Sequence, residues 1–374
     1  MKKGLRILMS LMKLDIGGAE THVLELAKEL KKRGAEVIVT SNGGAYEKEL
    51  TEFGIKHYKV PLQNKNPLNV IKAFKTLKQI IIDEKIELVH SHARIPSFIL
   101  GKLHKKMGFP FVTSAHGVFT TKYGLKYITD WGQAVVAVSE DIKKYLLDNY
   151  HFPKEKIVVT INGIDLEQFS PNTDKTPARE EFGLSEEDFV IGFVSRLDTD
   201  CTHAAREIIS KMPLLVEKIP NIKFLVVGGG SDYENIKALA ETVNKKYGRR
   251  IILAGGRTDM ARVIAPIDLF VGVSRAALEA MGAQKPVILA GNQGYIGLFD
   301  EENTKVSFDT NFCGRGCGDI NETNLYEDIL RFYNLSEERK KELGKYGRET
   351  VQKHYSVAKM TDDTIKVYNM VLPE

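Results

Sequence analysis

Residues 269–289 read LFVGVSRAALEAMGAQKPVIL, a stretch that contains a strand, a helix and a second strand in close succession. The apolar run 269–273 predicts a buried strand, the segment from Ala276 predicts a helix, and residues 286–289 predict the next strand. Two strands that are joined through a helix lie parallel in one sheet, because a parallel pair needs a crossover connection. The stretch therefore predicts a doubly wound α/β domain.

The same alternation of strands and helices continues through most of the chain. The polar segment 170–179 carries two prolines and interrupts the alternation, so we interpret it as a linker between two sheets. Before the linker the predicted strands are 6–12, 36–40, 88–91, 111–114, 134–138 and 157–161, and the predicted helices are 19–33, 47–53 and 68–84. After it the predicted strands are 190–194, 224–227, 251–254, 269–273 and 286–289, and the predicted helices are 204–218, 233–247 and one from residue 276.

Two domains fit 374 residues with 43% hydrophobic content better than one core does. We expect an amino-terminal domain at 1–169 and a carboxy-terminal domain at 170–354, each Rossmann-like and doubly wound, facing each other across a central cleft. The last helical stretch, 338–370, is interrupted near its middle. We expect the final part, 355–374, to cross back and complete the amino-terminal domain.

Composition restricts the classes of function. The 53 basic and 49 acidic residues leave a formal net charge of +4, which argues against a dedicated nucleic-acid binder. Cys201, Cys313 and Cys317 have no metal-finger spacing, and their odd number favours a reducing cytoplasm. No stretch approaches the roughly 18 apolar residues of a membrane-spanning helix.

Membrane contact is therefore expected only as peripheral docking at the inner face. The predicted helix 68–84 is amphipathic, which suits a lipid surface. The alternative is an ordinary helix that packs on its sheet and exposes its lysines to solvent. The apolar positions are Leu68, Ile71, Phe74, Leu77 and Ile81, and the neighbouring lysines are Lys72, Lys75 and Lys78.

The first predicted strand is followed by a glycine pair. Gly17 and Gly18 lie between this strand and a helix, where the missing Cβ lets the backbone approach a phosphate or a sugar. A tight strand-to-helix turn requires glycine as well, so the functional and the structural interpretation are equally open. The turn lacks the full GxGxxG pattern, which disfavours a nicotinamide-dependent dehydrogenase.

His116 lies just beyond the predicted strand 111–114, where a side chain enters the cleft and can contact a sugar hydroxyl. The alternative is a histidine that satisfies local backbone groups. His90 and His92 also end a strand, but because we identify no third ligand nearby we expect structural roles for them and no metal site. Asn162, in an Asn-Gly turn at the end of the first domain, is a candidate substrate contact.

In the second domain, Arg196 follows the strand 190–194, and its planar guanidinium suits a diphosphate. Pairing with a surface carboxylate is the alternative. Glycine-rich turns follow the next two strands, one containing Gly229 and the other preceding Arg257. Three such strand ends in one sheet together indicate a ligand-binding edge more strongly than any one alone.

The helix that begins near Ser274 and Arg275 follows a strand, so its amino terminus can face phosphates. Glu279, about one turn into this helix, can accept both hydroxyls of a ribose. Acidic residues also favour first helical turns for structural reasons. The next loop contains Gly294 and Tyr295, which we expect to be shaped to a ligand.

A possible metal motif is present but short. Residues 198–200 spell DxD, which binds a metal–diphosphate in single-domain glycosyltransferases. A two-residue match is common by chance, so we expect neither a metal nor a cofactor.

Taken together, these residues resemble the family-4 (group 1) glycosyltransferases of the GT-B fold, retaining enzymes that use UDP- or GDP-sugars. The motifs match in order and spacing along essentially the whole chain. They are Gly17-Gly18-Ala19-Glu20, Ala137-Val138-Ser139-Glu140, Asn162-Gly163-Ile164-Asp165, Arg196-Leu197, Leu278-Glu279-Ala280-Met281 and Lys285-Pro286-Val287-Ile288.

The resemblance implies that Gly17 and Gly18 approach the donor diphosphate, that Arg196 binds it, that Glu279 holds the ribose and that His116 lies near the transferred sugar. Two departures concern this donor site. Cys201 stands where the family carries lysine, and Val271 stands where the family carries the first glutamate of a pair. Arg275 is close enough in sequence to supply a substitute cation.

The expected function is metal-independent, retaining transfer of a sugar from a UDP- or GDP-sugar to an unidentified glycan, lipid-linked or small-molecule acceptor. The resemblance implies attack on the same face as the leaving diphosphate, which accepts the proton of the acceptor, so no protein nucleophile is needed. One alternative is a nucleotide-sugar-binding protein with weak or no catalysis. Another is a nucleotide-sugar epimerase, which forms product without an acceptor.

Overall fold

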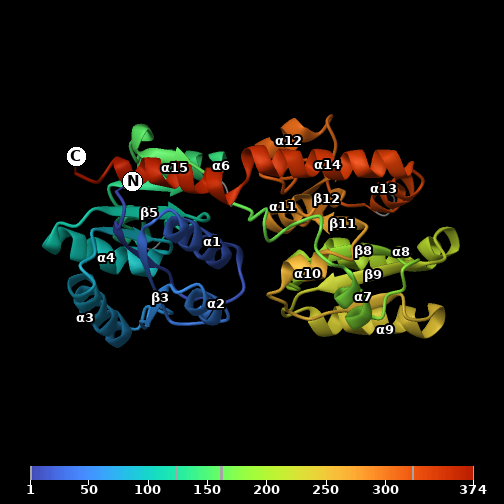
Figure 1. Cartoon of the computed structure of the whole chain (residues 1–374), viewed down its shortest axis with the longest axis horizontal. Helices are drawn as coiled ribbons and strands as arrows, with labels where there is room; N and C mark the ends of the chain where they lie inside the picture. The colour runs from blue at the N-terminus through green and yellow to red at the C-terminus, as the bar shows by residue number, and fades with distance from the viewer. Residues whose placement is uncertain (1, 123, 161–162, 322–323, 374) are drawn as a thin grey trace. The chain divides into compact units, whose positions relative to one another are not determined.

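The computed structural model describes residues 2–122, 124–160, 163–321 and 324–373, and the chain divides into two compact units (Figure 1). The first unit consists of Met1–Gly163 and Tyr355–Glu374, and the second of Ile164–His354. Each unit has its own sheet and its own hydrophobic core. In the described part of the chain, no helix is both long and apolar enough to cross a membrane.

The first unit is built around a parallel sheet. Its strands are β1 (Arg6–Ser10), β2 (Glu36–Ser41), β3 (Lys56–Lys59), β4 (Leu88–Ser91), β5 (Phe111–Ala115), β6 (Ala134–Ala137) and β7 (Ile157–Val159). Their order in the sheet is β3-β2-β1-β4-β5-β6-β7, so the order reverses between β1 and β4. The helices are α1 (Gly18–Lys32), α2 (Glu47–Glu52), α3 (Pro67–Asp83), α4 (Arg94–Met107), α5 (Leu125–Ile128), α6 (Glu140–Tyr150) and α15 (Val357–Asn369), with a 3₁₀ turn at Lys154–Lys156.

Strand β1 shows why helices cover both faces of this sheet. Successive side chains of a strand point to opposite faces. Ile7 packs with residues of α1 and α15, whereas Leu8 packs with residues of α3 and α4, and both are fully buried. A central parallel strand is apolar throughout for this reason.

Helix α15 returns the end of the chain to the first unit, as predicted (Figure 1). Ser356 caps it by accepting a hydrogen bond from the backbone N–H of Lys359. Gly163 is required where the helix passes, because a Cβ there would lie 2.6 Å from the Cα of Val357. Tyr368 is fully buried, and its hydroxyl lies 2.8 Å from Nδ1 of His90.

The second unit contains the second doubly wound sheet. Its strands are β8 (Phe189–Val194), β9 (Ile222–Val227), β10 (Ile251–Leu253), β11 (Leu269–Gly272), β12 (Val287–Gly291) and β13 (Gly294–Leu298). The order is β10-β9-β8-β11-β12-β13, parallel except for the antiparallel pair β12 and β13. The helices are α7 (Thr176–Phe182), α8 (His203–Lys218), α9 (Tyr233–Tyr247), α10 (Met260–Ile264), α11 (Ser274–Gly282), α12 (Thr304–Asp309), α13 (Asn324–Tyr333) and α14 (Glu337–His354), with a 3₁₀ turn at Thr199–Cys201.

The structure places the division between the units earlier than the predicted linker at 170–179. Ile164 and Phe169 are buried, and a Cβ on Gly282 would contact both of them. Nη1 of Arg348 donates a hydrogen bond to the carbonyl of Phe169 at 2.8 Å. These contacts hold the segment 164–169 on the second unit, and α7 occupies much of the predicted linker.

Candidate functional site

Each sheet has a switch point, where the strand order reverses. The reversal lies between β1 and β4 in the first unit and between β8 and β11 in the second. Ligands of open α/β sheets bind outside the carboxyl ends of the strands at this point. Gly17 and Gly18 follow β1, Arg196 follows β8, and Ser274 follows β11, so these predicted site residues lie at the switch points.

Arg196 is the exposed cation of the second switch point. Its side chain is 75% exposed, and Nη1 lies 3.7 Å from Oδ2 of Asp198. Asp198 itself accepts a hydrogen bond from the backbone N–H of Ser231, which lowers the pKa of its carboxyl group. A guanidinium with one long ion pair to a shared carboxylate remains available for a phosphate.

Glu279 is the buried anion of the same site. It lies one helical turn after Arg275, whose Nε donates a 2.8 Å hydrogen bond to Oε1 of Glu279. Burial raises the pKa of Glu279, and the Arg275 charge opposes this rise. This bond is to Oε1, and a carboxylate has about four acceptor positions, so Glu279 can accept hydroxyl groups as well.

Ser274 begins α11 in an unusual backbone conformation. Its φ of +56° lies in the left-handed region, which costs a non-glycine residue roughly 1–3 kcal/mol and is concentrated at functional sites. Its N–H donates to the carbonyl of Phe312 at 2.9 Å. Among the described residues, no side chain caps the amino terminus of α11, so this helix end offers backbone N–H groups to an anion.

The three glycines after β9 have different roles. A Cβ on Gly228 would lie 1.9 Å from the carbonyl oxygen of Ser195, and a Cβ on Gly230 would lie 2.5 Å from the backbone of Leu197. These two are required by close packing of the loops. Gly229 is exposed with no atom within 4 Å of such a Cβ, so it alone of the three leaves space for a ligand.

The structure engages Arg257 elsewhere. Its guanidinium forms hydrogen bonds with Asp259, at 2.8 and 2.7 Å, and with Glu181. Both carboxylates raise the pKa of Arg257. A guanidinium paired with two carboxylates has little remaining capacity for a diphosphate, so we remove Arg257 from the candidate site.

Gly294 and Tyr295 also serve the fold. They do not lie in a ligand loop, because they begin β13, which pairs with β12 in a hairpin. A Cβ on Gly294 would lie 1.8 Å from the carbonyl oxygen of Gly314, and the hydroxyl of Tyr295 donates to Asp328 on α13. We remove both residues from the candidate site.

In the first unit, the glycine pair opens α1. Gly17 is the residue before the helix and is extended, with φ −174° and ψ 162°. In the part of the chain that the structure describes, no side chain caps the start of this helix, and a Cβ on Gly18 would meet no atom within 4 Å. The space is open at Gly18 only, because a Cβ on Gly17 would lie 2.4 Å from a carboxylate oxygen of Glu20. A phosphate that approaches this turn therefore requires the Glu20 side chain to move away.

Histidines from three elements meet at the first switch point. His22 belongs to α1, His92 follows β4, and His116 follows β5. Nδ1 of His92 lies 3.2 Å from Nε2 of His116, and the His22 and His116 rings meet edge to face at 4.8 Å. The expectation that no third ligand lies near His92 is therefore wrong. The missed signal was topological, because β1, β4 and β5 are neighbours in the sheet.

Burial favours the neutral form of His92 and His116. Burial lowers the pKa of His116 to about 4 and that of His92 well below its usual value. Nε2 of His92 is buried and has no hydrogen-bond partner among the described residues, which costs roughly 1–3 kcal/mol. His90 is satisfied, with Tyr368 and Ser114 each 2.8 Å from its ring nitrogens.

Three further predictions concern single positions. Asn162 lies outside the described residues. Cys201 ends the 3₁₀ turn before α8 and is half-buried. Val271 is fully buried in β11, which lies inside the sheet between β8 and β12. Because α11 begins two residues after β11 ends, the turn between them is too short to be a loop that carries an acid.

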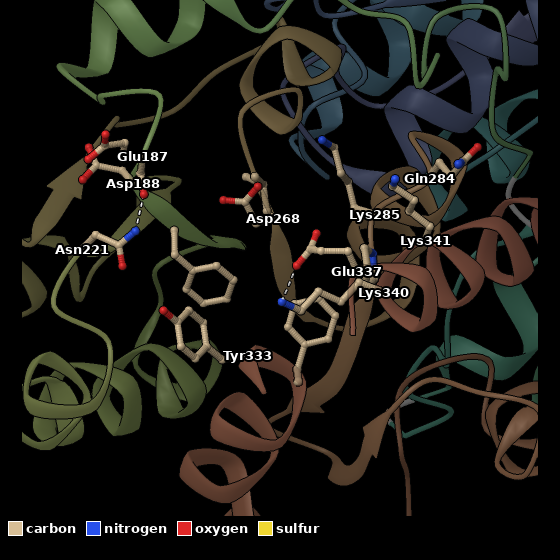
Figure 2. A pocket seen from close by; sticks show the side chains of 14 residues that line it. Glu187, Asp188, Asn221, Asp268, Gln284, Lys285, Tyr333, Glu337, Lys340 and Lys341 are labelled. Carbon is tan, nitrogen blue, oxygen red and sulfur yellow. Dashed lines mark hydrogen bonds and ion pairs between the residues drawn. The ribbon is translucent and has the colours of Figure 1, made fainter. Parts of the chain in front are cut away.

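A cavity of about 390 Å³ lies beside the amino-terminal ends of the strands in the second sheet (Figure 2). Its lining includes Phe189, Asp268 and Pro286, at the amino-terminal ends of β8, β11 and β12. Lys340 contributes from α14, bonded to Glu337 as the dashed line in Figure 2 shows. Because the cavity is at the amino-terminal edge, it is separate from the switch point.

Two family profiles match the chain. The profile described as Glycosyltransferase Family 4 matches residues 16–168, and that described as Glycosyl transferases group 1 matches residues 188–311. An uncharacterised glycosyltransferase of Methanocaldococcus jannaschii is 28% identical and covers 94% of this chain and 94% of its own.

Two other proteins are similar. The UDP-Gal:alpha-D-GlcNAc-diphosphoundecaprenol alpha-1,3-galactosyltransferase of Escherichia coli is 27% identical over 66% of this chain and 69% of its own. The crystal structure of Anabaena Alr3699/HepE in complex with UDP-glucose has a TM-score of 0.73 at 17% identity, covering 98% of this chain and 100% of that one. This likeness confirms the fold of the two sheets.

Proposed function

The chain belongs to the family-4 (group 1) glycosyltransferases of the GT-B fold, and from this premise we propose that it transfers a sugar from a UDP- or GDP-sugar with retention of configuration. The second switch point carries the proposal. Arg196 and the Arg275–Glu279 pair follow β8 and β11, two parallel strands that pair directly. The similar E. coli enzyme is named for a UDP-Gal donor, which supports a uridine nucleotide.

Different residues of this site bind the ribose and the diphosphate of the nucleotide sugar. Glu279 accepts the ribose hydroxyls, while Arg196 and the amino terminus of α11 bind the diphosphate. Gly229 leaves room for the nucleotide beside the loop after β9. In the first unit, Gly17 and Gly18 approach the diphosphate and His116 contacts the transferred sugar.

Departure of the diphosphate is the step that needs stabilisation, because negative charge develops on the leaving oxygen. Arg196, Arg275 and the uncapped helix ends supply positive charge and N–H donors. The leaving phosphate accepts the proton of the attacking hydroxyl on the same face, so the anomeric configuration is retained. Asp198 is bonded to Ser231 and paired with Arg196, which supports transfer without a DxD-bound metal.

The acceptor side is proposed from the first unit. Leu68 and Ile71 on α3 are 75% and 55% exposed, beside the exposed lysines Lys72, Lys75 and Lys78. A face that is both apolar and basic suits the surface of an anionic membrane. The similar E. coli enzyme acts on a diphosphoundecaprenol-linked sugar, so we propose a lipid-linked acceptor reached from the inner membrane face.

A screen of UDP- and GDP-sugars tests the function. We expect one donor to raise the melting temperature of the purified protein and to be hydrolysed slowly or transferred when glycan and lipid-linked acceptors are added. Conversion of the donor to an isomer without acceptor would identify an epimerase instead. If no nucleotide sugar or free nucleotide stabilises the folded protein, the proposed donor site is wrong.

A second candidate function rests on Cys201 and Val271. These positions lack the cation and the acid that the resemblance leads us to expect. A nucleotide-sugar-binding protein would bind UDP tightly and show no turnover with any acceptor. Tight binding of a donor together with measurable transfer would eliminate it.

A further inference from the structure

The three histidines of the first switch point have the geometry of a metal site. They are contributed by α1, by the segment after β4 and by the segment after β5, so the sheet holds them in place. One ligand atom from each of His22, His92 and His116 can be chosen so that all three lie within 4.8 Å of one another. All three residues belong to the first unit.

The separation of the closest pair agrees with tetrahedral coordination. Zn–N bonds of about 2.0–2.1 Å place neighbouring nitrogens of a tetrahedron about 3.3 Å apart. Nδ1 of His92 and Nε2 of His116 are 3.2 Å apart. The third nitrogen lies within 4.8 Å of the other two, so tetrahedral coordination requires it to move closer.

The surroundings select the kind of cation. Three imidazoles without a carboxylate favour zinc, copper, nickel or cobalt over magnesium and calcium, which prefer oxygen ligands. Nε2 of His92 is buried and has no hydrogen-bond partner in the described part of the chain, so the cluster contains a ring nitrogen that is left for a ligand.

His90 supports this cluster without joining it. Both of its ring nitrogens are engaged, by Tyr368 and Ser114. Its ring lies 4.0 Å from that of His92, so it limits the positions that His92 can adopt.

We propose that His22, His92 and His116 bind one first-row transition-metal cation, with Zn²⁺ as the probe. Three protein ligands leave a fourth position for water or a substrate oxygen. Because His116 is also the proposed contact of the transferred sugar, the cation and the sugar compete for this side chain. The metal-binding inference itself does not depend on that proposed function.

Metal binding to the purified full-length chain tests the proposal. After treatment with a chelator, we expect calorimetric titration to show one equivalent of Zn²⁺ bound. Co²⁺ in the same site should give the intense visible absorption of a tetrahedral complex. The variants H22A and H92A should each weaken Zn²⁺ binding by more than about tenfold. H151A is the matched control, because His151 is an exposed histidine in the same unit, and its binding should equal that of the unchanged protein.

Thermal unfolding without metal identifies variants that fail to fold, and H22N replaces any that do. The proposal is wrong if the unchanged protein binds no Zn²⁺, if its Co²⁺ complex has the weak spectrum of octahedral coordination, or if folded H22A and H92A bind Zn²⁺ as well as H151A does. None of these measurements uses transferase activity, so failure of the metal site is distinguishable from failure of the proposed function.

Discussion

Glu279 gives the sharpest test at the scale of single residues. The change Glu279→Gln keeps the side-chain volume next to Arg275 and removes the negative charge. If Glu279 binds the ribose, loss of charge-assisted hydrogen bonds should weaken UDP binding by roughly 1–2 kcal/mol, a five- to thirtyfold change. Isothermal titration calorimetry measures this directly.

Glu241 provides the control for that measurement, since it is an exposed glutamate on α9 of the same unit. Glu241→Gln should leave UDP affinity unchanged. Equal UDP affinity in the folded Glu279→Gln variant would remove Glu279 from the donor site.

Asp232 gives a pH-dependent prediction. Its buried carboxylate accepts hydrogen bonds from Arg206, Thr202 and Asn235, which lower its pKa to about 2. A folded-state pKa below the unfolded value of about 3.9 stabilises the protein above pH 4, and this contribution is lost as the pH falls toward 2. Because Arg206 is partly exposed, we expect about 1 kcal/mol.

Urea unfolding at pH 6 and pH 3 measures this contribution. Asp232→Asn should lower the free energy of unfolding at pH 6 and make it fall less between the two pH values. Asp200→Asn, at an exposed aspartate, is the control and should keep the profile of the unchanged protein. A steeper acid loss in Asp232→Asn would contradict the assigned direction of the pKa shift.

The sequence predicted the location of a residue correctly where that residue directly follows a buried strand. Arg196 and Ser274 follow apolar strands, and these strands are β8 and β11. It failed where a distant partner decided the role, because Arg257 binds Glu181 and Tyr295 binds Asp328. A single sequence contains no information on which of these charges meet in space.

At the scale of elements, α3 tests the proposed membrane contact. The structure buries Leu77 and Ile81 of the predicted apolar face and exposes Leu68 and Ile71. Each lysine near an anionic surface contributes about 1 kcal/mol. Replacing Lys72, Lys75 and Lys78 by glutamate should therefore abolish sedimentation with vesicles rich in acidic lipid at low salt.

The control replaces three exposed lysines of α9 in the second unit, Lys237, Lys245 and Lys246, by glutamate. It changes the net charge by the same amount and should leave vesicle binding intact. Equal loss in both variants would show a non-specific charge effect, and an unchanged protein that ignores the vesicles would overturn the proposed docking.

Long buried elements could be predicted from the sequence, whereas short edge strands could not. β1 contains the buried apolar run Ile7–Met9 and β11 begins with Leu269–Val271, because helices cover both sides of a central parallel strand. β3 reads KHYK and contains no fully buried side chain. β13 begins with glycine and pairs antiparallel, so neither apolar periodicity nor the parallel pattern indicated it.

At the scale of the whole molecule, the two units differ in how many segments of the chain form them. The second unit is one segment, Ile164–His354, whereas the first needs both ends of the chain. The sequence indicated this return through the interruption near His354. The sequence did not indicate that the chain passes from the first unit to the second at residue 164. Ile164 and Phe169 are placed in the second unit by their contacts with Gly282, a residue far from them along the chain.

This continuity leads to the last prediction, which concerns where the nucleotide binds. A fragment of residues 164–354 contains the complete second sheet and core, together with Arg196, Ser274, Arg275, Glu279 and Gly229. Because it has a complete sheet and core, the fragment should fold by itself. If these groups hold the nucleotide, UDP should stabilise the folded fragment by about 2.7 kcal/mol at a UDP concentration one hundred times the dissociation constant. It should show no transfer, because Gly17, Gly18 and His116 are missing.

Thermal unfolding with and without UDP measures the effect, and the same fragment with Glu279→Gln is the control. A folded fragment that UDP does not stabilise, beside a full chain that UDP does stabilise, would move the main nucleotide contacts to the first unit.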